Sequence, residues 1–325
     1  MANILYITPD FYVKSRFAGG MGTKTKALQA AWELEHNIET AAELDTTLSE
    51  LYDVIIIELL GLRNDNKLEE RVKHLQRCTA PKFVYGSDSE IFRWTGDELD
   101  MLKTVVDLWI PNCPWQANYF RDFDLPTTHV VYEPINCDLF RPSENSEKVI
   151  IAGGAINQEK NSNFFIELFD ALNSCKKEYQ TAYVGGNIWG GKPRAIDMKL
   201  RHELENKTDI FYGEVSQAKV ANALATASIG VLNPYYETCN RFDMELMASG
   251  KARLCGHHVC YDQRPTADRF DGSVEDCIAK LNLLTNEFEE FPAKVFGLEA
   301  RHYAEEHFSY EASLESLNDI LRRAL

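Results

Sequence analysis

The sequence lacks two features. It has no excess of basic residues, which binding to nucleic acid or to an anionic membrane surface requires, and it has no apolar run long enough to span a membrane. It contains 34 lysines and arginines against 50 aspartates and glutamates, so its formal net charge is -16. Sequence-independent binding to nucleic acid or to an anionic membrane needs clustered positive charge, and this balance disfavours both. No apolar stretch approaches the length of a membrane span, and the residues after Met1 lack a signal-peptide pattern. We therefore expect a cytoplasmic protein without a membrane span.

Closely spaced cysteine pairs are also missing. The eight cysteines are scattered along 325 residues, which favours reduced, mostly buried thiols over a disulfide framework. The nearest approach to a metal cluster is Cys255, His257, His258 and Cys260, but adjacent side chains on a strand diverge, so we expect no metal there. The length predicts about two domains, and an apolar fraction of 45% is sufficient for a core in each.

The segment from Ile229 to Gly256 carries the most informative pattern, which is strand, loop, helix, strand. Ile229 to Leu232 is a short apolar run that ends at Asn233 and Pro234, as expected of a buried parallel strand. Asn240 is placed to cap the following helix, and Gly250 occupies the position of a left-handed helix end. Glu237 in the loop and Glu245 in the helix are separated by seven residues, so both carboxylates are expected near one edge of the sheet.

These residues resemble the motif of the retaining glycosyltransferases of the GT-B fold, family four in the usual classification. The family motif is Glu, seven residues and Glu, followed by a small residue and Gly, and Glu237, Glu245, Ala248 and Gly250 match it. The resemblance implies that Glu237 contacts the transferred sugar and that Glu245 binds the ribose hydroxyls. It also implies that backbone amides at the helix start, near Asn240 and Arg241, hold the diphosphate, as helix N-termini do with anions.

The first strand, Ile4 to Thr8, leads through a loop to the glycines from Gly19 to Gly22, and a helix is expected from Thr23. Glycines at a strand-to-helix crossing lie where open α/β sheets bind ligands, although a tight turn that only glycine can make explains them equally well. The resemblance implies that the loop containing Gly20 and Gly22 faces the donor diphosphate and the acceptor.

Further strands complete a first α/β set. The sequence predicts strands at Asp53 to Leu60, Lys82 to Tyr85, Val106 to Pro111 and Val130 to Pro134, and a helix at Pro114 to Asp122.

Two polar features lie at the ends of these elements. Asp88 follows the strand that ends at Tyr85 and stands where the resembled family often has a catalytic His, but an Asx turn would also account for it. Asp122-Phe123-Asp124 has the form of a metal motif used by another glycosyltransferase fold. Because it ends a helix on the opposite edge of the sheet, we expect it to be solvated.

A second series begins with a strand at Lys148 to Ala152, followed by Gly153-Gly154, Lys160 and a helix from Ser162. The resembled family has a Gly-Arg pair and a later Lys here, and the Arg and the Lys neutralise the donor phosphates. Gly154 is at the position of the glycine. Lys160 matches the Lys, but Ala155 replaces the Arg, which removes a bidentate phosphate contact. We expect another cation to compensate, and the candidates are Arg241, Lys192 and Arg194.

The remaining pattern concerns the nucleotide base and the domain limits. A strand ends at Gly186, and a second strand carries Tyr212, so the resemblance places both residues beside the base. It also implies a two-domain α/β protein with two Rossmann-like, doubly wound parallel sheets facing a central cleft. The expected limits are residues 1–142 on the acceptor side, residues 143–300 on the donor side, and a closing helix at residues 301–325 that crosses back to the first domain.

The function expected from these patterns is transfer of a sugar, with retention and without a metal or cofactor, from a UDP- or GDP-sugar type of donor. The acceptor remains open among a saccharide, a small molecule, a lipid and modified nucleic acid. Two alternatives share the architecture, namely a nucleotide-sugar 2-epimerase and an inactive nucleotide-sugar-binding module. A dinucleotide dehydrogenase is disfavoured because Gly19 to Gly22 lacks the Gly-x-Gly-x-x-Gly spacing.

Overall fold

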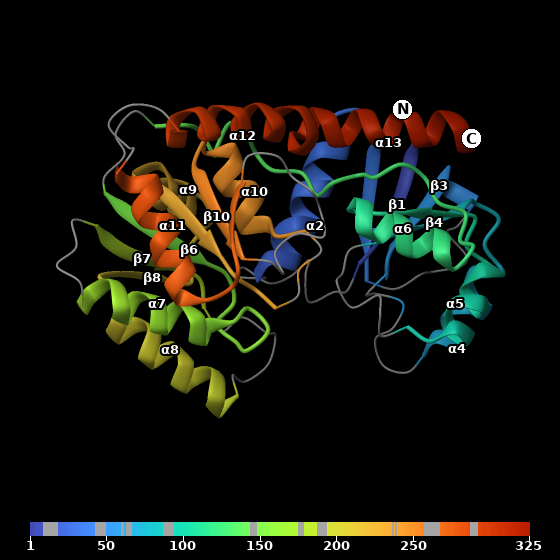
Figure 1. The fold of residues 1–325 in the computed structure, drawn as a ribbon. Helices are drawn as coiled ribbons and strands as arrows, with labels where there is room; N and C mark the ends of the chain where they lie inside the picture. Colours follow the sequence, from blue (N-terminus) through green and yellow to red (C-terminus); the bar gives the residue numbers. More distant parts are fainter. Residues whose placement is uncertain are drawn as a thin grey trace. The chain divides into compact units, whose positions relative to one another are not determined.

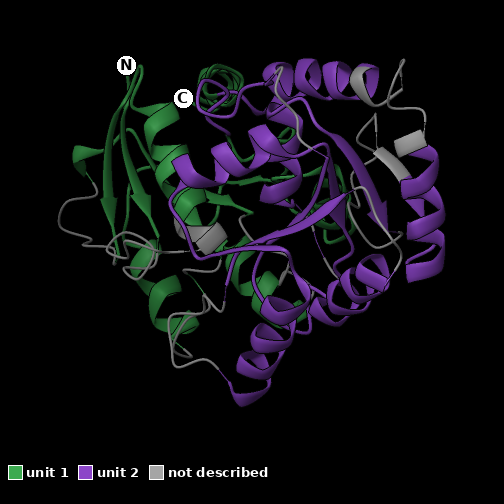
Figure 2. Cartoon of the chain, turned by 90° about the vertical axis from the view of Figure 1, so that its left-hand side faces the viewer, with its two compact units in different colours: residues 1–134, 310–325 green, residues 135–309 purple. Residues whose placement is uncertain are grey.

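The computed structural model divides into two α/β units (Figure 1). It describes residues 1–8, 19–42, 50–59, 62, 67–86, 94–143, 148–174, 179–186, 194–235, 237, 239–256, 267–286 and 292–325. Unit 1 comprises residues 1–134 and 310–325, and unit 2 comprises residues 135–309, as the two colours of Figure 2 show. The limit predicted after Pro142 lies inside unit 2, and the predicted closing segment is divided between the units after Ser309.

Unit 1 is built on a five-stranded parallel sheet in the order β2-β1-β3-β4-β5. Its strands are β1 (Asn3–Ile7), β2 (Asn37–Ala41), β3 (Val54–Glu58), β4 (Lys82–Tyr85) and β5 (Leu108–Ile110). In the register of the central pair, Ile4 lies opposite Val54 and Ile7 opposite Ile57. All five residues of β3 are buried, as its continuous apolar sequence predicts for a strand covered on both faces.

Helices cover both faces of this sheet because alternate residues of each strand point to opposite sides. Leu5 and Ile55 face one layer, whereas Ile4 and Ile56 face the other. The first layer consists of α4 (Leu68–Leu75), α5 (Gly96–Lys103) and α6 (Pro114–Asp122). The second consists of α2 (Gly19–Trp32) and α13 (Tyr310–Ala324) (Figure 1).

Helix α2 differs from its prediction at its start. It begins at Gly19 and not at Thr23, so Gly20 and Gly22 belong to its first turns and not to a loop. The first amides of a helix have no partner within the helix, so a poor helix former is tolerated better there than in the interior. The sequence predicts a loop at these glycines, whereas the helix that packs on the sheet extends through them.

The strand predicted at Val130 to Pro134 is wrong. This segment has no strand conformation, and its connection to the sheet is a hydrogen bond from the Val131 amide to the Pro111 carbonyl, 2.9 Å long. A single parallel bridge joins Thr127 to Trp109 just before it. Pro134 cannot donate to a ladder, and the apolar side chains of Val131 and Ile135 are buried without one.

Unit 2 contains a six-stranded parallel sheet in the order β11-β10-β9-β6-β7-β8. Its strands are β6 (Val149–Gly153), β7 (Gln180–Val184), β8 (Ile210–Gly213), β9 (Ile229–Leu232), β10 (Ala252–Gly256) and β11 (Ala267–Phe270). One face packs against α7 (Ser162–Ser174), α8 (Ala195–Lys207) and α11 (Val274–Asn286), and helices α9 (Gln217–Thr226), α10 (Arg241–Ala248) and α12 (Pro292–Phe308) complete the unit (Figure 1).

The Arg301 guanidinium links α12 to two other segments of unit 2. Arg301 Nη1 donates to the carbonyls of Cys137, Phe140 and Ala248, which belong to the segment that opens the unit and to the end of α10. A buried carbonyl without a donor costs free energy, so one cation with several donors stabilises three chain segments at once.

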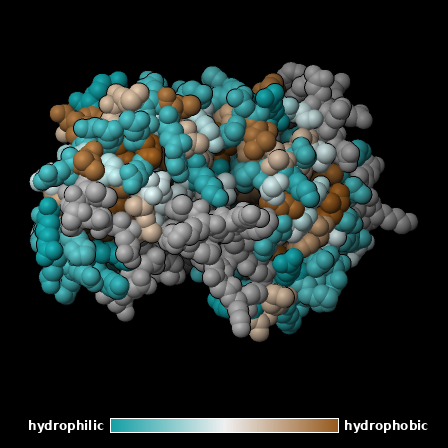
Figure 3. Space-filling model, turned by 180° about the vertical axis from the view of Figure 1, so that it is seen from behind, coloured by the Kyte–Doolittle hydropathy of each residue, from teal (hydrophilic) through white to brown (hydrophobic). Residues whose placement is uncertain are grey.

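The exposed face drawn in Figure 3 is mostly hydrophilic among its coloured residues, and apolar side chains occur there in small groups. None of the helices in the described segments combines the length and the apolar character that a membrane crossing requires. The cysteines that the structure describes form no disulfide, and all of them except the half-buried Cys137 are buried, as their spacing predicted. Asp122 and Asp124 are exposed at the end of α6, as expected for a solvated pair.

Lys251, which precedes β10, is a buried cation with a testable effect on stability. It is 5% exposed, and its Nζ donates to the Ala225 carbonyl in the last turn of α9, 3.0 Å away. Burial lowers the pKa of Lys251 from 10.5 to about 8. Between these two values the unfolded chain binds a proton that the folded chain has lost, so this residue makes stability rise with pH.

Lys251→Met is therefore expected to raise the melting temperature at pH 7, because it removes a charge whose burial destabilises the fold. The advantage over the parent should shrink as the pH rises through 8 towards 10.5. Thermal melts of both proteins across this range measure it, with the exposed Lys73→Met as the control. A variant less stable than the parent at every pH would show that the bond to Ala225 outweighs desolvation.

Candidate functional site

Glycines at the carboxyl ends of β6, β7 and β8 bring the backbone of three loops together. The Gly154 amide donates to the Val184 carbonyl, and the Gly185 amide donates to the Gly213 carbonyl, at 3.0 and 2.9 Å. A Cβ on Gly185 would lie 1.9 Å from the Gly154 oxygen, so that position does not accept a side chain, and one on Gly186 would displace the Glu214 side chain, 2.3 Å away. Gly154 has a φ of +131°, and a Cβ there would meet no atom of the described residues within 4 Å.

The turn between β6 and α7 presents Lys160. The Asn157 side chain accepts from the Lys160 amide at 2.8 Å, and Ser162 Oγ accepts from the Asn157 amide at 3.0 Å. Asn161 adopts a φ of +54°, the left-handed conformation that Asn tolerates best among residues other than glycine. These bonds fix the backbone at Lys160. The Asn157 side-chain amide, Nδ2, is buried and has no hydrogen-bond partner among the described residues.

The loop between β9 and α10 presents Glu237, and it joins the Lys160 turn. Asn240 caps α10 as predicted, because its side chain accepts from the Asp243 amide at 3.1 Å. The carboxylate of Glu237 forms an ion pair with Lys160 Nζ. A second link runs from the Tyr235 amide to the Glu159 carbonyl, 3.0 Å long. Strands β6 and β9 are neighbours in the sheet, so adjacent strand ends carry the two linked loops.

Glu245 lies inside α10 and is 3% exposed. Burial raises the pKa of its carboxyl group, whereas the charge of Arg241 and the side-chain hydrogen bonds of Gln217 and Arg241 oppose the rise. Arg241 Nε donates to Glu245 Oε1 at 3.1 Å. The structure thus brings both glutamates of the predicted motif into contact with a cation, Glu237 with Lys160 and Glu245 with Arg241.

The other acidic residue of α10, Asp243, forms a fully buried ion pair. Arg253 Nη1 in β10 donates to Asp243 Oδ1 at 2.6 Å, and both side chains are fully buried. The pair joins the first turn of α10 to the strand that follows it. It therefore holds the amino end of the helix against the sheet, close to the cap at Asn240.

The candidates for the missing arginine differ in their present partners. Arg194 donates from Nε and Nη2 to both oxygens of Asp197, so its guanidinium is engaged at the start of α8. Arg241 uses Nε for Glu245, and within the described part of the chain its buried Nη1 makes no hydrogen bond. Lys192 lies outside the described residues. Of the two that are described, Arg241 is the one at the amino end of α10.

The other predicted site residues have separate positions. Tyr212 is half-buried in β8, beside the strand that ends before Gly186. Gly20 and Gly22 lie in the first turns of α2 in unit 1. Asp88 falls outside the described residues, as do His257, His258 and Cys260 of the cluster for which no metal was expected. Among the residues that are described, no group of three or more His, Cys, Asp and Glu is placed to hold a metal ion.

Sequence reasoning missed a buried polar cluster in unit 1, centred on Glu58 at the carboxyl end of β3. Tyr6 and Thr8 donate to its two oxygens, each at 2.6 Å. Lys24 Nζ lies 3.8 Å from Glu58 and 3.8 Å from Glu133, and neither Lys24 nor Glu58 is exposed. Burial and the Glu58 carboxylate raise the pKa of Tyr6. The available signal was a charged residue at the end of an otherwise apolar strand, DVIIIE.

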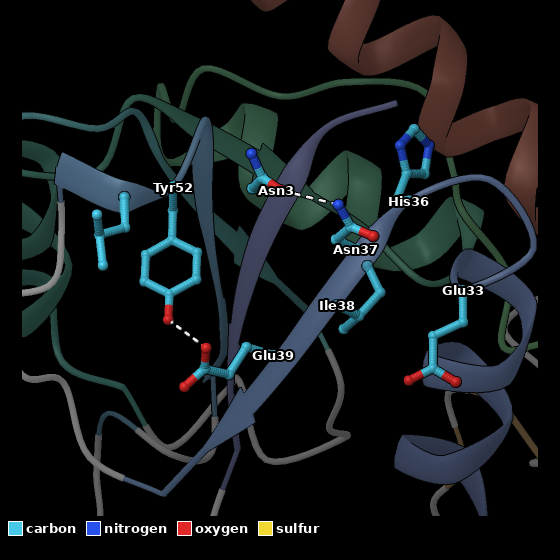
Figure 4. A pocket seen from close by; sticks show the side chains of 8 residues that line it. Asn3, Glu33, His36, Asn37, Ile38, Glu39 and Tyr52 are labelled. Carbon is cyan, nitrogen blue, oxygen red and sulfur yellow. Dashed lines mark hydrogen bonds between the residues drawn. The ribbon is translucent and has the colours of Figure 1, made fainter.

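A cavity of about 530 Å³ lies at the opposite edge of the same sheet, by the first residues of β1 and β2 (Figure 4). Its polar groups already bond to one another, since Asn37 donates to Asn3 at 3.0 Å and Tyr52 donates to Glu39 at 2.6 Å. His36 contacts the Ala2 amide and Asn318. These lining groups are satisfied without a ligand, and the cavity lies away from the strand ends where α/β sheets bind ligands.

Comparison with known proteins places the fold. No protein-family model matches the chain, and no curated protein sequence matches it. Among solved structures, a sucrose-phosphate synthase from Thermosynechococcus elongatus superposes with a TM-score of 0.78 at 14% identity, covering 99% of both chains. HepE from Anabaena in complex with UDP-glucose gives 0.75 at 14% identity, covering 99% of this chain and 100% of HepE. A glycosyltransferase from Rickettsia africae gives 0.73 at 12% identity, covering 99% and 98%.

These similarities extend over both units, and the two parallel-sheet α/β domains match structures of GT-B glycosyltransferases. The predicted fold class is confirmed in these terms. At such identities the likeness concerns the fold, and residue roles depend on the geometry of this chain.

Proposed function

We propose that the protein is a retaining glycosyltransferase that takes its sugar from a UDP- or GDP-sugar. The observation that carries the proposal is the grouping of Lys160, Glu237, Arg241 and Glu245 around the amino end of α10, at the carboxyl edge of a parallel sheet. Open α/β sheets bind ligands at that edge, and a helix amino end favours an anion. The similarity to HepE, whose structure contains UDP-glucose, supports a nucleotide-sugar donor.

In this proposal, different residues of unit 2 bind different parts of the donor. Lys160, the first amides of α10 and Arg241 Nη1, which has no partner among the described residues, bind the diphosphate, and Arg241 thereby replaces the arginine missing at Ala155. Glu245 accepts hydrogen bonds from the ribose hydroxyls, and Glu237 accepts them from the sugar. The side-chain-free backbone at Gly154 and Gly186 approaches the donor, with Tyr212 beside the base. Asp88 and the glycines of α2 remain predicted contacts on the acceptor side.

The proposed transfer breaks the bond between the anomeric carbon and the diphosphate oxygen. The acceptor oxygen forms a bond to the same carbon from the face that the phosphate leaves, and the acceptor proton passes to the departing phosphate oxygen. Charge on the leaving group is met by Lys160, Arg241 and the α10 amides, which belong to neighbouring loops of the same sheet edge. A divalent metal is therefore not required, and Glu237 positions the sugar without attacking it.

The donor is tested with a thermal-shift panel of UDP, GDP, ADP and TDP. A nucleotide that binds only the folded chain, supplied at a hundredfold over its dissociation constant, adds about 2.7 kcal/mol of stability. We expect UDP or GDP to raise the melting temperature and ADP and TDP to change it little. If neither these nucleotides nor UDP-glucose and GDP-mannose shift the transition, the protein does not use a UDP- or GDP-sugar donor.

The stereochemistry is tested separately on the product. With a donor and acceptor pair that supports turnover, NMR should assign the product the anomeric configuration of the donor, both with and without a chelator. An inverted product, or activity lost to chelator and restored by manganese, would contradict the mechanism. An epimerised free sugar would instead identify the 2-epimerase alternative.

A further inference from the structure

The pair formed by Lys160 and Glu237 joins two loops that contact different parts of the donor in the proposed function, namely the diphosphate and the sugar. Lys160 belongs to the turn after β6 and Glu237 to the loop after β9, and the backbone bond from Tyr235 to Glu159 holds the two loops together. The Lys160 side chain is 30% exposed and that of Glu237 is 10% exposed, so solvent and ligands reach the lysine more readily than the carboxylate. A ligand anion at the amino end of α10 therefore meets a lysine that already has a partner.

We propose that Glu237 occupies Lys160 in the free protein, and that the donor diphosphate displaces it, which makes the pair a device for selecting nucleotide-sugar over free nucleotide. The inference rests on the proposed function, and it assigns Glu237 a role in specificity beyond positioning the sugar. Lysine is a compact point charge, so a diphosphate with more than one negative charge competes effectively for it.

Displacement leaves a carboxylate that is 8% exposed and has lost its cation. A buried, unpartnered charge is costly, so Glu237 must find new donors. The sugar hydroxyls of a complete donor supply them, whereas UDP alone supplies none. Free nucleotide therefore binds more weakly, because nothing compensates for breaking the ion pair. The sugar hydroxyls of the complete nucleotide-sugar do compensate for it.

A second observation indicates that a ligand belongs beside this turn. The Nδ2 amide of Asn157 is buried without an acceptor in the described segments, although the same side chain fixes the Lys160 amide. Most buried polar groups have a partner in folded proteins, so an orphaned donor next to a candidate phosphate contact is consistent with an acceptor that arrives with the ligand.

The experiment compares UDP with UDP-glucose by calorimetry, and GDP with GDP-mannose if the panel favours guanine. Glu237→Gln keeps the shape of the side chain but releases Lys160 from its ion pair. We expect this variant to bind the free diphosphate roughly tenfold more tightly than the parent and to lose most of its preference for the sugar form. Glu159→Gln removes an exposed carboxylate from the same turn, and it should change neither value appreciably.

Lys160→Met, alone and combined with Glu237→Gln, completes a double-mutant cycle. It should weaken binding of the diphosphate, and in this background Glu237→Gln should no longer tighten it, because the competition requires the lysine. Equal tightening in both backgrounds would assign the effect to net charge and overturn the inference. So would a Glu237→Gln protein that binds UDP no better than the parent. If the parent binds neither the panel nucleotides nor UDP-glucose and GDP-mannose, the proposed function fails first, which distinguishes the two results.

Discussion

Glu245→Gln is expected to weaken nucleotide binding by about a hundredfold while leaving the free energy of unfolding close to that of the parent. The carboxylate is the only charged acceptor available to two ribose hydroxyls in the proposal, and hydrogen bonds to a charged group contribute about 1.5–3 kcal/mol each. Glutamine retains one oxygen that can accept from Arg241 Nε, which now lies 3.1 Å from the carboxylate. Calorimetry with the nucleotide selected by the panel measures the binding.

The choice of glutamine follows from the burial of this pair. Glu245→Ala would leave Arg241 with no acceptor at its Nε, so a loss of binding could reflect a loss of fold. Glu167→Gln, on the exposed side of α7, controls for the change in charge. If Glu245→Gln binds nucleotide as tightly as the parent, the ribose assignment is wrong.

Asp243→Ala should destabilise the fold by about 3–5 kcal/mol, because it leaves the Arg253 guanidinium buried without its carboxylate. The two side chains are fully buried and are joined at 2.6 Å, so water cannot replace the lost partner. The midpoint of urea unfolding, monitored by circular dichroism, should fall accordingly, with an unchanged slope.

Two comparisons give this prediction its control. The exposed pair of Lys207 and Asp170 lies at the surface, and Asp170→Ala should cost no more than about 1 kcal/mol. Combining Asp243→Ala with Arg253→Met should cost less than the sum of the two single changes, since the double variant leaves no uncompensated charge. Additive losses would show that the two side chains act independently.

The elements that sequence predicted best are those defined by local chemistry. Strand β9 occupies Ile229–Leu232, the predicted range, because an apolar run followed by Asn233 and Pro234 marks both its interior and its end. The start of α10 was predictable because the Asn240 cap is an interaction between neighbours in sequence, and Gly250 has the left-handed φ of +64° that its position required.

The misses concern interactions between residues distant in sequence. Lys160 and Glu237 are 77 positions apart, and nothing local indicates that they pair. The network around Glu58 joins segments about as far apart, so a single charge at the end of β3 revealed little about it. The start of α2 was misjudged for the same reason, because its packing on the sheet outweighs the low helix propensity of Gly19 to Gly22.

The assembly of unit 1 from residues 1–134 and 310–325 has a consequence for biosynthesis. Helix α13 supplies Leu317, Ile320 and Leu321 to the same core as Leu28 and Trp32, and Ser313 accepts from the Trp32 indole at 3.3 Å.

During translation this core stays incomplete until residues 310–325 leave the ribosome, after all of unit 2 has emerged. Exposed apolar surface of this kind is a site of aggregation and of chaperone binding. The segment made first is therefore the last to reach its final fold, so a ribosome that stalls within unit 2 releases an unfinished first domain.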